Sequence, residues 1–159
     1  MVLGDRLLKE SDMLGLASFG FFIVLVGVIF VITPNLVDKI GEFFRSFELV
    51  EVYPGVNFPA PTSSHPVLYT AVAQFCVAYG LFHLPVLFLR VYLEDYLSRK
   101  AGALSGIVFW LGAGYFLIIL SAGNIGWFAF LSGLIIFAGL SLVVRSLVIL
   151  LFGVVRRTL

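Results

Sequence analysis

Four long apolar runs dominate the pattern of hydrophobic and polar positions along the chain. They cover roughly residues 13–33, 67–89, 103–121 and 125–152, and charged side chains are rare within them. A helix needs about 20 apolar residues to cross the ~30 Å hydrocarbon core of a bilayer. The pattern therefore predicts four transmembrane helices, of which the last two are joined by a tight turn at Gly123, Asn124 and Gly126.

The segment after the first run has a helical periodicity, with charged residues between the apolar ones. The apolar positions are Leu36, Val37, Ile40, Phe43, Phe44 and Phe47. This pattern predicts an amphipathic helix over about residues 35–48 that lies in the membrane interface on the external side. Because its polar face carries acidic residues as well as Lys39 and Arg45, we expect this helix to cover the outer ends of the spans rather than to bind anionic lipid.

Residues 51–66 contain four prolines, which exclude a regular helix and favour extended or turn conformations. We expect this segment to form either an ordered lid or a loose strap. His65, near its end, is expected to be a solvated loop histidine rather than a ligand.

Composition indicates that lipid is the solvent. Of the 159 residues, 61% are hydrophobic and 12% are charged, and the mean hydropathy is +1.12. We therefore expect one all-α integral membrane domain over residues 1–159. The first run is longer than the apolar core of a signal peptide, so it is expected to be retained. Ten Lys and Arg against nine Asp and Glu leave no basic field, which excludes nucleic acid as a main partner.

The distribution of basic residues predicts the orientation in the membrane. One side carries seven of them, and the other side carries only Lys39 and Arg45. The seven are Arg6, Lys9, Arg90, Arg99, Lys100, Arg156 and Arg157. By the positive-inside rule both termini are expected in the cytoplasm, in a multi-pass protein of the cell membrane.

Two absences limit the chemistry. Cys76 is the only cysteine, so an intrachain disulfide and a cysteine-cluster metal site are both excluded. The four runs contain no Asp or Glu, which removes the usual carrier for proton or sodium coupling. We expect no cofactor, no metal and no enzymatic activity.

The second run contains the most informative polar residue, His83, two positions before Pro85. On a helix, its face also carries Tyr69, Ala73, Cys76, Gly80, Leu87 and Arg90. Small and polar residues mediate helix contacts in membranes, so this face is expected to pack on protein. His83 is then a neutral packing residue bonded to a carbonyl, near the carbonyl of Leu81 that Pro85 leaves without a partner.

Further candidate residues lie near this face or opposite to it. Gln74 lies on the opposite face, where it meets either protein or a pore. Tyr79 and Tyr69 could join His83 in a haem or quinone site. Arg145 is open to three interpretations: it marks the cytoplasmic boundary, it bonds the second span, or it belongs to a transport or ligand site.

Two further patterns complete the predicted helices. Gly102 and Gly106 begin a series of small residues in the third run, which is typical of close helix packing. The sequence RVYLEDYLSRK after the second run is expected to extend that helix into the cytoplasm. Its pairs Arg90–Glu94 and Asp95–Arg99 should then lie on a solvated face.

Three functions fit these observations. The first is a non-catalytic subunit or scaffold that acts through helix contacts, in a homo-oligomer or beside a larger membrane partner. The second is an oligomeric ion channel or small-solute transporter, with Gln74, His83, Asn124 and Arg145 lining a path between protomers. The third is a membrane haem or quinone protein. Membrane lipid is the expected surrounding in all three.

Overall fold

The structure is a computed structural model that describes residues 2–158 and the side chains of residues 13–153. Its elements in chain order are α1 (Val2–Ile32), α2 (Leu36–Arg45), β1 (Phe47–Tyr53), β2 (Val56–Pro61), α3 (Pro66–Tyr92), α4 (Leu97–Ser121) and α5 (Trp127–Thr158). Four of the helices, α1, α3, α4 and α5, are long and apolar enough to cross a membrane. The prediction of four long apolar helices is therefore confirmed.

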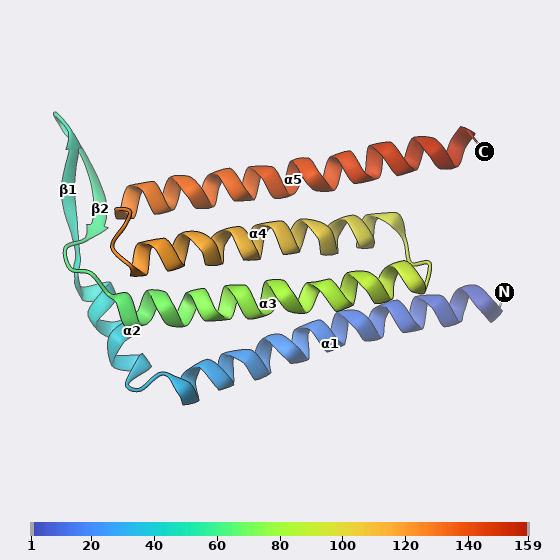
Figure 1. The fold of residues 1–159 in the computed structure, drawn as a ribbon, viewed down its shortest axis with the longest axis horizontal. Helices are drawn as coiled ribbons and strands as arrows, with labels where there is room; N and C mark the ends of the chain where they lie inside the picture. Colours follow the sequence, from blue (N-terminus) through green and yellow to red (C-terminus); the bar gives the residue numbers. More distant parts are fainter. Residues whose placement is uncertain (1, 159) are drawn as a thin grey trace.

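The four long helices lie side by side in the order α1, α3, α4, α5, and neighbours in this order run antiparallel (Figure 1). At one end of the array lie α2 and the two strands. At the other end lie the beginning of α1, the end of α5 and the connection between α3 and α4. Each long helix also extends beyond its predicted apolar run, because the polar residues at its ends continue the helix.

The centre of the array is α4, which packs closely on α3 and α5 because small residues remove side chains from both contacts. A side chain at Gly114 would lie 2.7 Å from Val77 of α3, and one at Gly112 would overlap the ring of Phe137 of α5. Such close approach replaces the hydrophobic effect as the source of helix association in lipid. The buried cluster here consists of Tyr69, Ala73, Cys76, Ala113, Leu117, Leu120 and Phe130.

Aromatic stacking joins α1 to the array. The rings of Phe21 and Phe82 stack with centroids 3.9 Å apart, and Phe22 meets Phe75 edge to face at 5.3 Å. These contacts connect α1 to α3. The outer faces of α1 remain uncovered, and only 11% of its candidate span is buried, against 39% for α4.

The predicted short helix is present as α2, but it is shorter than expected. Leu36 is buried, and Ile40 and Phe43 pack on a cluster formed by Ile29, Leu68 and Ala71. On the exposed side the Lys39 ammonium donates a 2.8 Å hydrogen bond to Glu42, which lowers the pKa of that carboxyl. The helix ends at Arg45 because the chain turns at Ser46 into β1.

The proline-rich segment forms an antiparallel β-hairpin, which the sequence analysis did not predict. Phe47 pairs with Pro61 at one end, and Tyr53 pairs with Val56 beside the turn. The turn contains Pro54 and Gly55, and Gly55 has a φ of 79°, which glycine adopts without strain. Both strands are edge strands, where a proline removes no ladder hydrogen bond that the sheet needs.

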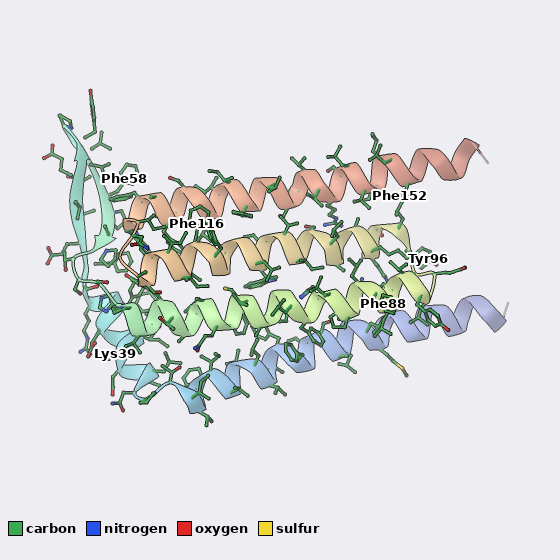
Figure 2. The ribbon with its side chains drawn as sticks, in the orientation of Figure 1. Lys39, Phe58, Phe88, Tyr96, Phe116 and Phe152 are labelled. Atoms are coloured by element: carbon green, nitrogen blue, oxygen red, sulfur yellow. The ribbon has the colours of Figure 1, made fainter. Side chains whose placement is uncertain are left out.

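The hairpin contacts the bundle through aromatic rings. Phe58 of β2 lies beside the beginning of α5 (Figure 2), where its ring centroid is 6.4 Å from that of Phe128. Phe47 of β1 meets Trp127 at 5.7 Å. The expected lid is therefore an ordered two-stranded element at one end of the bundle.

The connection between α3 and α4 differs from the predicted helical extension. The helix α3 ends at Tyr92, and Glu94 has a φ of 52°, which no α-helix contains. The chain then reverses, and α4 begins at Leu97. Tyr96 lies in this connection, at the end opposite the hairpin (Figure 2). The charged residues of this segment therefore do not form one solvated helical face.

Candidate functional site

His83 lies in the contact between α3 and α4. Its Nδ1 donates to the backbone oxygen of Tyr79 at 2.8 Å, because a carbonyl can only accept. Its ring lies against Gly106, where an added side chain would approach the ring to 3.1 Å. The ring of Tyr79 meets it edge to face at 4.6 Å. The histidine thus has a bond within its own helix and occupies space that a glycine of α4 leaves open.

A cavity of about 350 Å³, the arginine cavity, is lined in part by His83 and lies between four helices. It is lined by Gly15 and Ser18 of α1, His83, Val86 and Arg90 of α3, Ser98, Arg99, Gly102 and Ala103 of α4, and Arg145 of α5. Two of the predicted site residues, His83 and Arg145, therefore line the same cavity. The structure shows no hydrogen bond between them within the described residues.

Arg90 connects this cavity to the backbone of α4. Its Nη1 donates to the backbone oxygen of Arg99 at 3.0 Å. Its Nε is buried and has no hydrogen-bond partner among the described residues. A buried donor without a partner is uncommon in proteins. Arg145, by contrast, is exposed at the rim.

Asp95 corrects the expectation of an exposed ion pair. Its side chain is only 4% exposed, and Oδ1 accepts a 2.7 Å hydrogen bond from the amide of Tyr96. Oδ1 also lies 3.9 Å from Nη1 of Arg99, whose guanidinium is 5.8 Å from the ring of Tyr96. The predicted Arg90–Glu94 pair is absent from the described residues, since Arg90 bonds the backbone of α4 instead. The reversal of the chain after α3 causes both differences.

Cys76 and Gly80, two further predicted residues, are buried between α3 and α4. A side chain at Gly80 would lie 2.8 Å from Leu111, and Cys76 is 4% exposed. Tyr69 and Ala73 of the same face are also buried, so this face packs on protein as expected. Tyr79 packs on Trp110 and His83, with ring centroids 5.2 Å and 4.6 Å away.

Gln74 and Asn124 lie far from the arginine cavity, toward the hairpin end. Gln74 is exposed and lines a separate cavity with Thr33 and Thr70. Asn124 is exposed in the turn between α4 and α5. One chain therefore does not bring Gln74, His83, Asn124 and Arg145 together. Tyr69 and Tyr79 are also about 15 Å apart along α3, at a rise of 1.5 Å per residue.

The expectation that His65 is solvated is wrong. It precedes α3, is 9% exposed and has two serine neighbours, with Nε2 at 2.9 Å from Oγ of Ser46 and 3.0 Å from Oγ of Ser63. Its ring also meets Phe43 edge to face. His65 therefore connects Ser46, which precedes β1, and Ser63, which follows β2, to the start of α3.

The sequence did not identify Arg90, Asp95 or Arg99 as site residues. Arg90 shares a face with His83 in the sequence pattern, so it could have been recognised as a cavity residue. Arg99 and Asp95 depend on a chain reversal that helical periodicity does not indicate. Among the described residues, no group of three or more His, Cys, Asp or Glu side chains is placed to hold a metal.

Comparison of the chain with protein-family models, with curated proteins and with solved structures finds no match. Function is therefore inferred from the geometry alone.

Proposed function

We propose that this protein is a multi-pass membrane protein that acts as a non-catalytic subunit or scaffold. It works through contacts between its outer helices and those of a second copy or of another membrane polypeptide. Four long apolar helices support the membrane setting. The observation that carries the proposal is a row of small residues on the open face of α5.

This row consists of Ser132, Gly139, Ser146 and Gly153, spaced seven residues apart. Seven residues nearly complete two helical turns, so the four share one face. Ser132, Gly139 and Ser146 are exposed. A side chain added at Gly139 or Gly153 would meet no atom of the described residues within 4 Å.

The row lies on the side of α5 that faces away from α4. Phe130, Gly133 and Phe137 make the contact with α4 from the opposite face. A glycine offers lipid chains no side chain to contact, whereas a second helix can approach the backbone of α5 closely at this position. The row therefore favours a protein partner over lipid at this face.

A similar but shorter row is present on α1. Gly20 and Gly27 are exposed and seven residues apart, and Val24 and Val31 lie on the same face. Side chains at either glycine would meet no atom of the described residues within 4 Å. Both outer helices of the array thus present faces suited to lateral association.

The proposed orientation has both termini in the cytoplasm of a cell-membrane protein. The Lys and Arg asymmetry supports it, although four of its residues, Arg6, Lys9, Arg156 and Arg157, have side chains outside the described set. In this orientation α2 and the hairpin lie externally. The exposed side chains of Val37 and Phe44 on α2 would then meet the membrane interface.

The test is the molecular mass of the purified chain in a mild neutral detergent. We expect the mass of a particle larger than one 17.5 kDa chain, either a closed homo-oligomer or a complex with a second polypeptide. Replacing Gly139 by leucine should reduce it to one chain, because the new side chain separates the helices. An absorbance spectrum recorded on the same sample tests the haem alternative.

The matched control is Ala129→Leu, which adds a similar volume at an exposed position about a quarter of the helix circumference from the row. It should leave the mass unchanged. A single 17.5 kDa chain in the unsubstituted protein, or equal effects of the two substitutions, would refute the proposal.

A further inference from the structure

We infer that the arginine cavity, lined by His83, Arg90, Arg99 and Arg145, binds an anionic phosphate group of the kind that a phospholipid headgroup carries. The inference does not depend on the proposed helix contacts of α5. It starts from the donors that line the cavity and that the described residues leave unsatisfied.

Two guanidinium groups in this cavity, those of Arg90 and Arg145, have no carboxylate partner among the residues whose side chains the structure describes. Arg90 uses Nη1 for the backbone of α4, and its buried Nε has no partner among the described residues. Arg145 makes no hydrogen bond or ion pair within the described residues. The carboxylate of Asp95 lies 3.9 Å from Arg99 through Oδ1, and its buried Oδ2 has no hydrogen-bond partner among the described residues.

Guanidinium groups select the chemistry of the ligand. Their planar forks of N–H donors match phosphate and carboxylate oxygens, and the resulting charge-assisted hydrogen bonds are the strong ones. A cation would be repelled, and a neutral ligand would leave the two positive charges of Arg90 and Arg145 uncompensated in a partly desolvated site. An anion with several acceptor oxygens accepts hydrogen bonds from the guanidinium groups and also compensates their positive charges.

The depth of the cavity favours a lipid headgroup as the source of that anion. The twenty residues 125–144, which precede Arg145, already cover the ~30 Å hydrocarbon core when helical, and the cavity lies at the end of the array opposite the hairpin. This is a position near the headgroup level of a leaflet. Small residues of α1, Gly15 and Ser18, form one wall and leave room for a headgroup.

Exposed apolar side chains are close in sequence to the cavity residues. Leu16 and Phe19 of α1, adjacent to Gly15 and Ser18, are 72% and 61% exposed. Leu142 of α5, three residues before Arg145, is 62% exposed. Acyl chains of a lipid whose phosphate enters the cavity can cover these side chains, whereas a free phosphate ion would leave them bare.

The experiment measures the thermal stability and native mass of the full chain in a neutral detergent with three probes. These are phosphatidylglycerol, phosphatidylcholine and inorganic phosphate. We expect phosphatidylglycerol to raise the melting temperature and to remain bound in the mass spectrum. Phosphatidylcholine and inorganic phosphate should do less at the same concentration.

Arg145→Gln is the decisive variant because the side chain is exposed and its loss should leave the fold intact. It should weaken binding of phosphatidylglycerol by about tenfold or more, the value of one hydrogen bond to a charged group. Arg145→Lys, which keeps the charge, should recover part of the affinity. Arg45→Gln is the matched control, because Arg45 is an exposed arginine of α2 at the other end of the molecule.

The outcomes separate the alternatives. Equal stabilisation by phosphatidylglycerol and phosphatidylcholine, or equal weakening by Arg145→Gln and Arg45→Gln, overturns the anion site. Equal stabilisation by inorganic phosphate and phosphatidylglycerol, lost in Arg145→Gln, overturns the lipid headgroup as the source and assigns the cavity to a free anion.

Discussion

Replacing Gly112 with alanine should weaken the contact between α4 and α5. The added Cβ would overlap the ring of Phe137, meeting Cγ and Cδ1 first and lying 2.5 Å from Cε1. Cγ lies on the axis about which the ring turns, so a rotation of the ring about that axis does not remove the overlap. The ring is also confined by Phe116, whose centroid is 5.9 Å away. Either Phe137 leaves its position or the two helices move apart.

The size of the effect follows from two opposing contributions. Overpacking of a close contact costs about 1–3 kcal/mol. An alanine in a helix interior is favoured over glycine by about 1 kcal/mol, so Gly112→Ala should destabilise by about 0–2 kcal/mol in total. Gly102→Ala, in the same helix, has no described atom within 4 Å of its Cβ and keeps the favourable contribution alone. The two variants should therefore differ by about 1–3 kcal/mol.

The assay is unfolding by SDS in mixed micelles, followed through the fluorescence of Trp110 and Trp127. The double variant Gly112→Ala with Phe137→Leu supplies a second criterion, because a smaller side chain at 137 relieves the overlap. It should show a smaller effect of Gly112→Ala than the wild-type background. Equal stabilities of Gly112→Ala and Gly102→Ala would refute the close approach, and an unchanged effect in the double variant would show that Phe137 is not the obstacle.

Three further predictions concern the membrane orientation, Cys76 and His83. Reporter fusions at Leu159 and near Ser63 should report opposite sides of the membrane, with Leu159 cytoplasmic; an external carboxyl terminus would refute the orientation. Cys76 should resist lipid-soluble maleimides until the protein is denatured, because it is buried between α3 and α4; rapid labelling of folded protein would contradict this packing. His83→Leu should lower stability by about 1 kcal/mol by removing the donor to Tyr79, and His83→Gln, which keeps a donor, should be milder. Equal losses would mean that the hydrogen bond contributes nothing.

The four long helices could be predicted because a span must be continuously apolar over about 20 residues, and few other structures require that pattern. The residues at which these helices end could not be predicted. Arg90 and Tyr92 still belong to α3, while Glu94 adopts a left-handed conformation. The choice of turning point depends on how α4 packs back on α3, which is a tertiary effect.

The hairpin was missed although a local signal exists. Pro54 and Gly55 stand between two runs rich in β-branched and aromatic residues, and a proline followed by glycine is typical of a turn with positive φ. The four prolines were interpreted as excluding a helix and favouring extended or turn conformations, and the pairing of two strands was not inferred. Pro59 and Pro61 fit into β2 because the described residues contain no third strand that would need hydrogen bonds from the amide hydrogens that proline lacks.

The cavity was only partly predictable. His83 and Arg145 were recognised by their polarity within apolar runs, whereas Arg90 was placed on the face of His83 but expected in a solvated pair with Glu94. Their meeting with Arg99 requires the reversal at Leu93 to Tyr96, which brings the start of α4 beside the end of α3. Residues before and after such a turn can line one cavity although no helical periodicity in the sequence connects them.

The weak attachment of α1 has a consequence for biosynthesis. In the proposed membrane setting each long helix can pair with the preceding long helix as soon as it has been synthesised, since α3 packs on α1, α4 on α3 and α5 on α4. The contact of α1 with α3, which includes Phe21 with Phe82 and Phe22 with Phe75, is the least extensive of the three. The first helix pair to form during synthesis is therefore also the one held by the smallest contact.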